Sequence, residues 1–340
     1  MLRVGAVCVL LSVLSHCQPS AAACLHLPAD TISTIFLCVD KSGCCNFTTV
    51  QAAVDAVPKD NTKRAVIVIT SGVYVEKVTV VKPNITFQGQ GLIATMIVWN
   101  DTASSTGTTP DSASVYIHGE GFVAKNVSFK NSAPAAEPGA VGAQAVALRI
   151  DGDKAVFWGC GIFSGQDTLL DDANRHYFRD CFIEGSIDFI FGDGRSLYEN
   201  CTLNSVAEAS PQQSITGAIT AQGRKFPDND TGFSFVGCTI QGTGWILLGR
   251  AWQPYSRVVF AYTSMPAIVA PQGWDNWGDG QRNSTVFYGE FNCVGDGANM
   301  AGRVPYAQKL NDMAAKPFLD ISYIDGAEWI KPFDDALVVY

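Results

Sequence analysis

Two aspartates, two glutamines and an arginine recur in short motifs in the middle of the sequence, and their spacing is the clearest indication of chemistry. The candidate site residues are Gln144, Gln166, Asp167, Asp188, Arg250 and Trp252. Gln144 and Gln166 are 22 residues apart, as are Gln166 and Asp188, and Asp167 and Asp188 are 21 apart. A period near 20 residues is typical of a solenoid, so these side chains are expected to converge on one outer face.

These residue types together favour ester hydrolysis. Two carboxylates alone would also suit an inverting glycosidase, and a denser acidic cluster would suit a Ca²⁺-dependent lyase. Gln144 and Gln166 are neutral amide donors, which suit a developing oxyanion on an acyl carbon. Arg250 can keep one carboxylate ionised and lower its pKa, whereas repulsion raises the pKa of the other. The set then supplies an anionic nucleophile, a proton donor and two oxyanion donors.

Other hydrolytic machinery is not evident in the sequence. It contains no Gly-x-Ser-x-Gly elbow, and the three histidines after residue 23, His26, His118 and His176, show no metal-ligand spacing. Trp252 can either pack in the core or form a platform for a sugar ring.

A second repeat indicates the fold that positions these groups. It reads Phe157-x-x-Cys160-x-Ile162, Phe178-x-x-Cys181-x-Ile183, Tyr198-x-x-Cys201-x-Leu203 and Phe235-x-x-Cys238-x-Ile240. The units are rich in Val, Ile, Phe and Thr and are too short for a helical repeat, which predicts three short strands per coil of a parallel β-helix. Strand spacing places adjacent coils about 4.8 Å apart, so residues 21 or 22 apart lie above one another.

The cysteines leave two alternatives open. Cys160, Cys181 and Cys201 could bridge adjacent coils, or they could form a ladder of buried thiols, and no catalytic role is expected at these inward positions. Four others are expected to staple the N-terminal segment, namely Cys24, Cys38, Cys44 and Cys45.

Composition and the first residues indicate secretion. The 340-residue chain is 47% hydrophobic and only 16% charged, with a net charge of −9, which argues against nucleic-acid or anionic-membrane partners. Residues 1–23 resemble a signal peptide, with Arg3, an apolar run over 4–14 and small residues at 21–23. Seven glycosylation sequons fit secretion, at Asn46, Asn84, Asn100, Asn126, Asn200, Asn229 and Asn283, of which Asn126 and Asn200 are expected inside strands.

One catalytic domain is expected to follow the signal peptide. We divide it into a Cys-rich segment (24–47), a parallel β-helix (48–295) and a C-terminal tail (296–340) that packs back along the barrel. A short helix over 48–58, with a capping box of Thr48 and Gln51, should cover the open end of the β-helix. Residues 101–113 and 131–143 are predicted to be surface loops, and residues 307–315 a helix.

Taken together, the motifs resemble those of plant pectin methylesterases, almost to the C-terminus. The matching segments are Phe47–Gln51, Gly72–Glu76, Gln144–Leu148, Gly165–Leu169, Asp188–Gly192, Leu248–Trp252, Gly273–Trp277 and Arg282–Glu290. The resemblance implies an all-β fold, a single-stranded right-handed parallel β-helix, with no metal or organic cofactor. It also implies removal of C6 methyl esters from homogalacturonan, with release of methanol, in the cell wall.

The resemblance further implies a role for each site residue. Asp188 would be the nucleophile and Asp167 the general acid/base. Gln144 and Gln166 would form the oxyanion hole. Arg250 would orient Asp188, and Trp252 would line the substrate groove.

The sequence departs from many plant members in two places. It has no room for an N-terminal inhibitor-like domain, which predicts the short type, and Val304-Pro-Tyr306 stands where a tryptophan often follows the proline. The expected partners are methyl-esterified homogalacturonan and a proteinaceous pectinesterase inhibitor, with the enzyme a monomer. The rival hypotheses are a β-helix lyase or glycosidase that cleaves pectin, and a catalytically silent wall-binding protein.

Overall fold

The computed structural model of the protein describes residues 27–135 and 141–330. The predicted signal peptide, Cys24, His26 and the last ten residues of the predicted tail therefore lie outside the described residues. Across the described ranges, no helix has both the length and the apolar character needed to cross a membrane.

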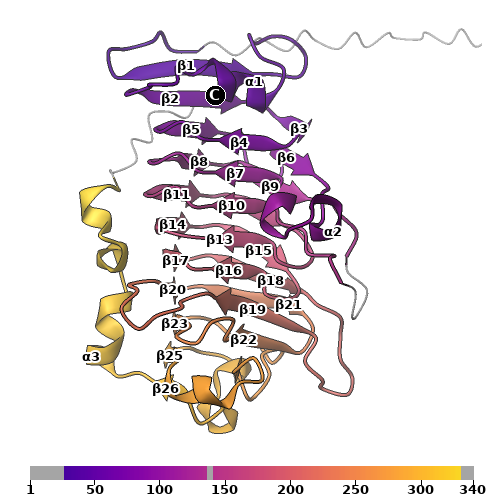
Figure 1. The fold of residues 1–340 in the computed structure, drawn as a ribbon, viewed down its shortest axis with the longest axis vertical. Coiled ribbons are helices and arrows are strands. Elements are labelled where there is room, and N and C mark those ends of the chain that lie inside the picture. Colours follow the sequence, from indigo (N-terminus) through magenta and orange to yellow (C-terminus); the bar gives the residue numbers. More distant parts are fainter. Residues whose placement is uncertain (1–26, 136–140, 331–340) are drawn as a thin grey trace, which may run out of the picture.

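The fold is a right-handed parallel β-helix, as predicted. In the described part of the chain the strands form three parallel sheets of 11, 8 and 7 strands, here called sheets A, C and B. Figure 1 shows the coils stacked along the long axis of the molecule, with β1 at one end and β26 at the other. From β4 to β21 each coil contributes one strand to each sheet, in the chain order C, A, B, as in β10, β11 and β12.

Within each sheet, the strands lie in chain order from one end of the stack to the other. Sheet A contains β1 (Thr34–Val39), β2 (Arg64–Ile69), β5 (Ile85–Gln88), β8 (Val123–Lys125), β11 (Ala155–Trp158), β14 (Arg175–Arg179), β17 (Arg195–Glu199), β20 (Gly232–Val236), β23 (Arg257–Ala261), β25 (Phe287–Phe291) and β26 (Ala307–Lys309). Sheet B contains β3 (Gly72–Val75), β6 (Thr95–Trp99), β9 (Ser128–Asn131), β12 (Gly161–Phe163), β15 (Phe182–Gly185), β18 (Thr202–Val206) and β21 (Thr239–Thr243). Sheet C contains β4 (Val78–Val80), β7 (Val115–Ile117), β10 (Leu148–Ile150), β13 (Leu169–Asp171), β16 (Ile190–Gly192), β19 (Gly217–Gln222), β22 (Ile246–Arg250) and β24 (Trp274–Asp275).

The aromatic positions of the repeat form a stack inside the barrel. Phe157 lies over Phe178 with ring centroids 4.9 Å apart, and Phe178 lies over Tyr198 at 4.5 Å. The stack continues through Phe235 and Phe260 at 4.5 and 4.6 Å. Strand register therefore places equivalent residues of successive coils in direct contact, and their burial forms one continuous core.

The cysteines of the repeat form a ladder of buried thiols and not disulfides. Cys160, Cys181, Cys201 and Cys238 are free and buried. Each of the last three donates a hydrogen bond from Sγ to the main-chain carbonyl of the aromatic residue one coil earlier, at 3.4, 3.6 and 3.4 Å. Burial raises the pKa of Cys181 well above its ordinary value, as expected for an unreactive thiol.

Two glycosylation sequons, at Asn126 and Asn200, were expected inside strands. That expectation was wrong, because both lie in turns between sheets A and B. Both asparagines are exposed and have left-handed φ values of 53° and 55°. Asparagine adopts this conformation more readily than most residues, so each asparagine closes a corner of the coil.

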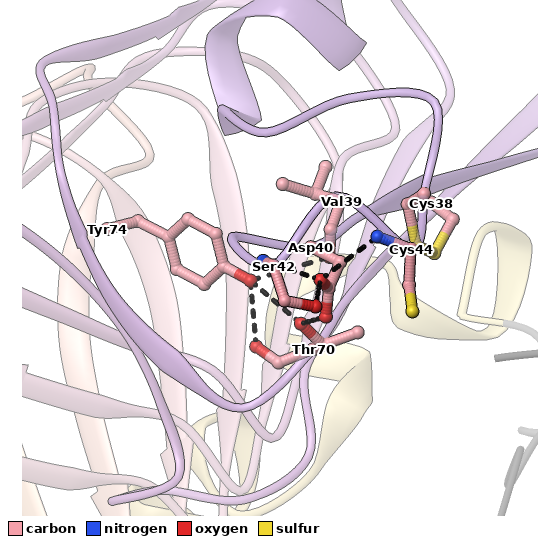
Figure 2. Close-up of a disulfide and its surroundings, with 8 residues drawn as sticks. Cys38, Val39, Asp40, Ser42, Cys44, Thr70 and Tyr74 are labelled. Atoms are coloured by element: carbon pink, nitrogen blue, oxygen red, sulfur yellow. Dashed lines mark hydrogen bonds between the residues drawn. A yellow bond between two sulfur atoms is a disulfide. The ribbon is translucent and has the colours of Figure 1, made fainter. Parts of the chain in front are cut away.

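The N-terminal end of the barrel is closed by the Cys-rich segment. Its strand β1 pairs with β2 in sheet A, and Cys38 is disulfide-bonded to Cys45. Figure 2 shows Asp40 beside this disulfide, where its carboxylate accepts hydrogen bonds from Ser42, Thr70 and the Cys44 amide. The hydroxyl of Ser42 in particular lowers the pKa of Asp40, so the loop is organised around an ionised carboxylate.

The short helix predicted over residues 48–58 is present as α1 (Val50–Ala56), but its cap differs from the prediction. Thr49, not Thr48, is the N-cap residue. The two carboxylate oxygens of Glu76 accept the amides of Val50 and Gln51 at 2.7 and 2.9 Å. Gln51 does not complete a capping box, because its side chain bonds with the main chain of Thr79.

The other helices lie in the connections and in the C-terminal segment. They are α2 (Ala103–Thr106), α3 (Asp312–Ala315) and the 3-10 helices η1 (Pro110–Ser112), η2 (Gly280–Ser284), η3 (Asp296–Ala298), η4 (Met300–Gly302), η5 (Lys316–Phe318), η6 (Ile321–Ile324) and η7 (Gly326–Glu328). The predicted loop over 101–113 therefore contains two short helices. The predicted helix over 307–315 is wrong at its start, because β26 extends sheet A by pairing with β25 before α3 begins.

The described part of the C-terminal segment packs back along sheet A, as predicted (Figure 1). Ser234 on β20 donates a hydrogen bond to the carbonyl of Phe318 at 2.6 Å. Asp325 pairs with Arg175 and Arg195 on neighbouring strands, at 3.3 and 3.0 Å. The apolar side chains of η5 and η6 cover the outer face of sheet A. This described segment does not cover the outer face of sheet C.

Candidate active site

All six predicted site residues line one cleft on the outer side of sheet C. The cleft has a volume of about 440 Å³. Its described lining consists of Thr109, Pro110, Gln144, Gln166, Asp167, Leu170, Asp172, Asp188, Phe191, Ala221, Arg250, Trp252 and Trp277. Segments that are more than 100 residues apart in the sequence therefore meet at one place because the coils stack.

The floor of the cleft is a row of outward residues in register. Leu170 on β13 pairs with Phe191 on β16, which pairs with Ala221 on β19 and then with Arg250 on β22. Leu170, Phe191 and Ala221 form a buried apolar cluster separate from the barrel core. The strand pairing thus builds an apolar floor, with Arg250 at one edge.

The two aspartates enter this floor from equivalent turns. Asp167 lies two residues before β13 and Asp188 two residues before β16. Both have left-handed φ values, 58° and 50°. Non-glycine residues with positive φ are uncommon and cluster at functional sites, although aspartate adopts this conformation more readily than most residues.

Arg250 holds the carboxylate of Asp188 with two hydrogen bonds. Its Nε donates to Oδ1 at 2.9 Å and its Nη2 donates to Oδ2. Such a bidentate pair fixes the orientation of the carboxylate and favours its ionised form. The face of Arg250 is covered by Trp277, whose ring centroid lies 4.3 Å from Cζ. Asp188 is only 5% exposed, so the pair is screened little by water.

The net pKa direction of Asp188 differs from the expectation for an arginine-paired carboxylate. Burial raises the pKa of Asp188, and the hydrogen bonds and charge of Arg250 act in the opposite direction without cancelling that effect. The expectation of a lowered pKa was therefore wrong, because it considered the partner and not the desolvation.

Asp167 is half-buried and receives no such ion pair. Burial and the charge of Asp188 raise the pKa of Asp167 well above its ordinary value, as expected, and Arg250 and Gln166 act in the opposite direction. Because only Asp188 receives the two arginine hydrogen bonds, Asp188 ionises first and Asp167 keeps its proton.

The two glutamines are half-buried and are fixed through their main chains. The carbonyl of Gln166 accepts a hydrogen bond from Ala145 at 3.1 Å, which ties it to the coil that carries Gln144. The carbonyl of Gln144 accepts one from Ala103 at 2.8 Å, which ties it to the loop with α2. Both amide side chains can therefore be presented to the cleft from rigid turns.

Two tryptophans form the exposed rim. Trp252 is 37% exposed and packs edge-on against Phe191 at a centroid distance of 6.0 Å. Trp277 is 38% exposed. Arg282 donates a hydrogen bond to the carbonyl of Trp252 at 3.2 Å and so supports the turn that carries it. Trp252 is thus a rim residue and not part of the core.

The sequence reasoning did not identify several lining residues as site residues. Phe191 and Trp277 lie inside motifs that were recognised, Asp188–Gly192 and Gly273–Trp277, so their aromatic character was the available signal. Leu170 and Asp172 follow directly from strand register once β13 is placed. Thr109 and Pro110 come from a loop, and no periodicity in the sequence points to them.

No group of three His, Cys, Asp or Glu side chains within residues 27–135 and 141–330 is arranged to hold a metal ion. The expectation that no metal or organic cofactor is needed stays a prediction.

Comparisons with known proteins place the chain in one family and fold. A family model described as Pectinesterase matches residues 36–327. The chain is 56% identical over 308 residues to Probable pectinesterase 8 of Arabidopsis thaliana, covering 89% of this chain and 78% of that protein. It superposes on a pectin methylesterase from carrot with a TM-score of 0.81 and 33% identity, covering 90% and 99% of the two chains. A pectin methylesterase in complex with a hexasaccharide is also similar, with a TM-score of 0.76, 25% identity and coverage of 87% and 98%.

Proposed function

The chain belongs to the pectinesterase family, the carboxylic ester hydrolases that remove methyl esters from pectin, and we propose that its cleft aspartates carry out this reaction on homogalacturonan. The observation that carries the proposal is the asymmetry between the two carboxylates. Asp188 receives both hydrogen bonds of Arg250, whereas Asp167 lies beside that charge and keeps a raised pKa. One carboxylate is therefore suited to attack and the other to proton transfer.

The first half of the reaction forms an acyl-enzyme. A carboxylate oxygen of Asp188 attacks the C6 carbonyl carbon of a methyl-esterified galacturonosyl unit, and the carbonyl π electrons move onto oxygen. The tetrahedral intermediate then collapses, the bond to the methoxy oxygen breaks, and the proton of Asp167 passes to that oxygen, so methanol leaves.

The second half restores the enzyme. Asp167, now ionised, takes a proton from water as the water oxygen attacks the acyl carbon. The bond to the Asp188 oxygen breaks, the free galacturonate carboxyl is released, and Asp167 is protonated again for the next turnover. No electrons are gained or lost, and one water is consumed for each methanol.

The remaining predicted residues have supporting roles. Gln144 and Gln166 donate hydrogen bonds to the oxyanion that develops on the carbonyl oxygen. Arg250 orients Asp188, and Trp252 provides a platform for a sugar ring. We keep these as parts of the proposal, together with the boundaries of the signal peptide (1–23), the Cys-rich segment (24–47), the catalytic β-helix (48–295) and the tail (296–340).

The proposal also covers where the protein acts, its oligomeric state and its regulation. The related plant pectinesterases act on cell-wall pectin. We propose that this chain is secreted through residues 1–23 and acts in the apoplast as a monomer, with a proteinaceous inhibitor as its regulator. Disulfide bonding of Cys38 to Cys45 supports an oxidising destination.

The test is to incubate the purified mature chain with highly methyl-esterified homogalacturonan and to follow methanol and viscosity together. Methanol release at constant viscosity is the expected result. A fall in viscosity without methanol would instead support a cleaving lyase or glycosidase, and no change in either quantity would support a silent binding protein.

A further inference from the structure

We propose that Asp172 makes the cleft select against de-esterified, anionic sugar units beside the unit whose ester is cleaved. This inference rests on the proposed function, because it concerns which neighbours of the reacting ester the same cleft accepts.

Asp172 lies in the same cleft as the catalytic pair but at its other side. It follows β13 directly, whereas Asp167 precedes β13, and both side chains line the cleft. The three residues of β13 lie between Asp167 and Asp172, and each strand residue advances the chain by about 3.3 Å. Asp172 therefore faces a part of a polymeric substrate beyond the ester that Asp167 serves.

The charge of Asp172 is only partly neutralised by its surroundings. Arg149 on β10 reaches Asp172 Oδ2 with its Nη2 at 3.3 Å, but the same nitrogen lies 3.9 Å from Asp151 Oδ2. One guanidinium thus serves two carboxylates. The side chain of Asp172 also remains 36% exposed.

Arg149 is not free to turn toward a ligand. Its guanidinium lies over the ring of Tyr116, with Cζ 4.4 Å from the ring centroid. The hydroxyl of Tyr116 donates a hydrogen bond to Asp151 at 2.6 Å, and Nδ1 of His118 lies 2.7 Å from the other oxygen of Asp151. These contacts hold Arg149 between the two aspartates, so its charge is committed to them.

The rest of the described cleft lining contains no unpaired cation that could bind an anionic sugar unit. Among the described side chains that line it, Asp167, Asp172 and Asp188 are acidic, and Arg250 is the one cation. Arg250 is already engaged by Asp188. A free galacturonate carboxylate next to the reacting unit would meet Asp172 while Arg149 and Arg250 are already paired with carboxylates of the protein.

A methyl-esterified neighbour meets a favourable surface instead. The floor between the two acidic positions is formed by Leu170 and Phe191, which are apolar and buried. A neutral ester with an exposed methyl group can cover this floor, whereas a carboxylate would lose hydration there. Repulsion from Asp172 and the apolar floor thus favour the same, fully esterified, segment of substrate.

The test compares kcat/KM for methanol release on highly esterified homogalacturonan with kcat/KM on the same polymer after random partial de-esterification by alkali. The ratio of the two values is the selectivity. In Asp172→Asn the repulsive charge is gone, and Arg149 has one carboxylate partner fewer, Asp151 alone, so the selectivity should fall about fivefold, the size of one surface charge contact. In Arg149→Gln both aspartates lose their cation, so the selectivity should rise.

Control measurements separate the possible outcomes. Asp180→Asn changes an exposed carboxylate in a turn outside the cleft lining and should leave the selectivity as in the wild type. The wild-type selectivity should also decrease as salt is raised, because salt screens the repulsion. An unchanged ratio in Asp172→Asn, or a salt-independent wild-type ratio, would overturn the inference even if methanol is released. Absence of methanol release from the wild type on both polymers would overturn the proposed function instead.

Discussion

Asp167 and Asp188 occupy equivalent positions in neighbouring coils, each two residues before a strand of sheet C and each with a left-handed backbone conformation. The strands that follow them pair Leu169 with Ile190, so the strand register itself sets the two carboxylates side by side. Two carboxylates in such proximity cannot both ionise easily, and Arg250 decides which one does. The repeat length of the fold is thus directly linked to the protonation of the site.

The pH profile of kcat/KM should be bell-shaped. The reaction needs Asp188 ionised, and burial raises its pKa, so activity should be lost on acidification at a higher pH than for an ordinary aspartate. It also needs Asp167 protonated, so activity should fall again as the pH exceeds the strongly raised pKa of Asp167. Methanol release measured across pH at constant ionic strength tests both limbs.

Replacement of Arg250 should move both limbs to higher pH, because Arg250 lowers the pKa of Asp167 as well as that of Asp188. Arg250 lowers the pKa of Asp188 relative to what burial alone would produce, so Arg250→Gln should shift the acid limb to higher pH. An acid limb that stays in place in Arg250→Gln would contradict the pairing as the cause, and an acid limb in the wild type at the pKa of an ordinary aspartate would contradict the effect of burial.

The oxyanion assignment predicts a large loss of turnover without loss of binding. Gln166→Ala should lower kcat about 10²–10³-fold with a small change in KM, because the lost donor acts mainly in the transition state. Gln308→Ala, an exposed glutamine on β26, is the matched control and should retain wild-type kinetics. Retention of most activity in Gln166→Ala would show that this amide does not stabilise the reacting oxygen.

Trp252 should contribute mainly to substrate binding. Its ring is at the rim and packs edge-on against Phe191, so Trp252→Ala should raise KM about tenfold and change kcat much less. Phe226→Ala removes an exposed aromatic ring outside the cleft lining and serves as the control. A fall in kcat with unchanged KM would assign Trp252 to positioning the chemistry and not to a binding platform.

A buried polar network beneath the cleft should dominate stability. His176 Nδ1 lies 2.5 Å from Asp171 Oδ1, and Tyr198 donates to the other oxygen of Asp171 at 2.6 Å. His176→Phe would remove one of the two side-chain partners of the buried Asp171, leaving Tyr198, and should lower the free energy of unfolding by about 3–5 kcal/mol. His118→Ala removes an exposed partner of Asp151 and should cost less than about 1 kcal/mol.

Urea unfolding followed by circular dichroism compares these two variants. The two histidines differ mainly in burial, so equal losses in the two variants would contradict the importance of the buried network. A small loss in His176→Phe would mean that Asp171 finds a new partner or takes up a proton.

Sequence periodicity was sufficient for the fold and for the location of the cleft. The 20–22-residue spacing predicted the coils and the gathering of Gln166, Asp167 and Asp188 on one face, and the structure has both. These features depend on strand register, which a repeat reveals directly.

Other features depend on interactions that a repeat does not encode. The N-cap at Thr49 depends on Glu76 in a later coil, and the raised pKa of Asp188 depends on how completely the stack buries it. Trp277 enters the cleft through a turn whose direction is set by tertiary packing. The roles assigned to the individual site residues stay predictions until variants are measured.

The most direct test of the central claim is methanol release by Asp188→Asn beside Asp180→Asn and the wild type. Asparagine preserves the size of the side chain and tolerates the left-handed backbone that Asp188 and Asp180 share, with φ values of 50° and 53°. The account predicts that Asp188→Asn, folded by circular dichroism, releases methanol at least about 10³-fold more slowly than the wild type, while Asp180→Asn is unaffected. Methanol release by Asp188→Asn at a rate close to that of the wild type would show that Asp188 is not the nucleophile.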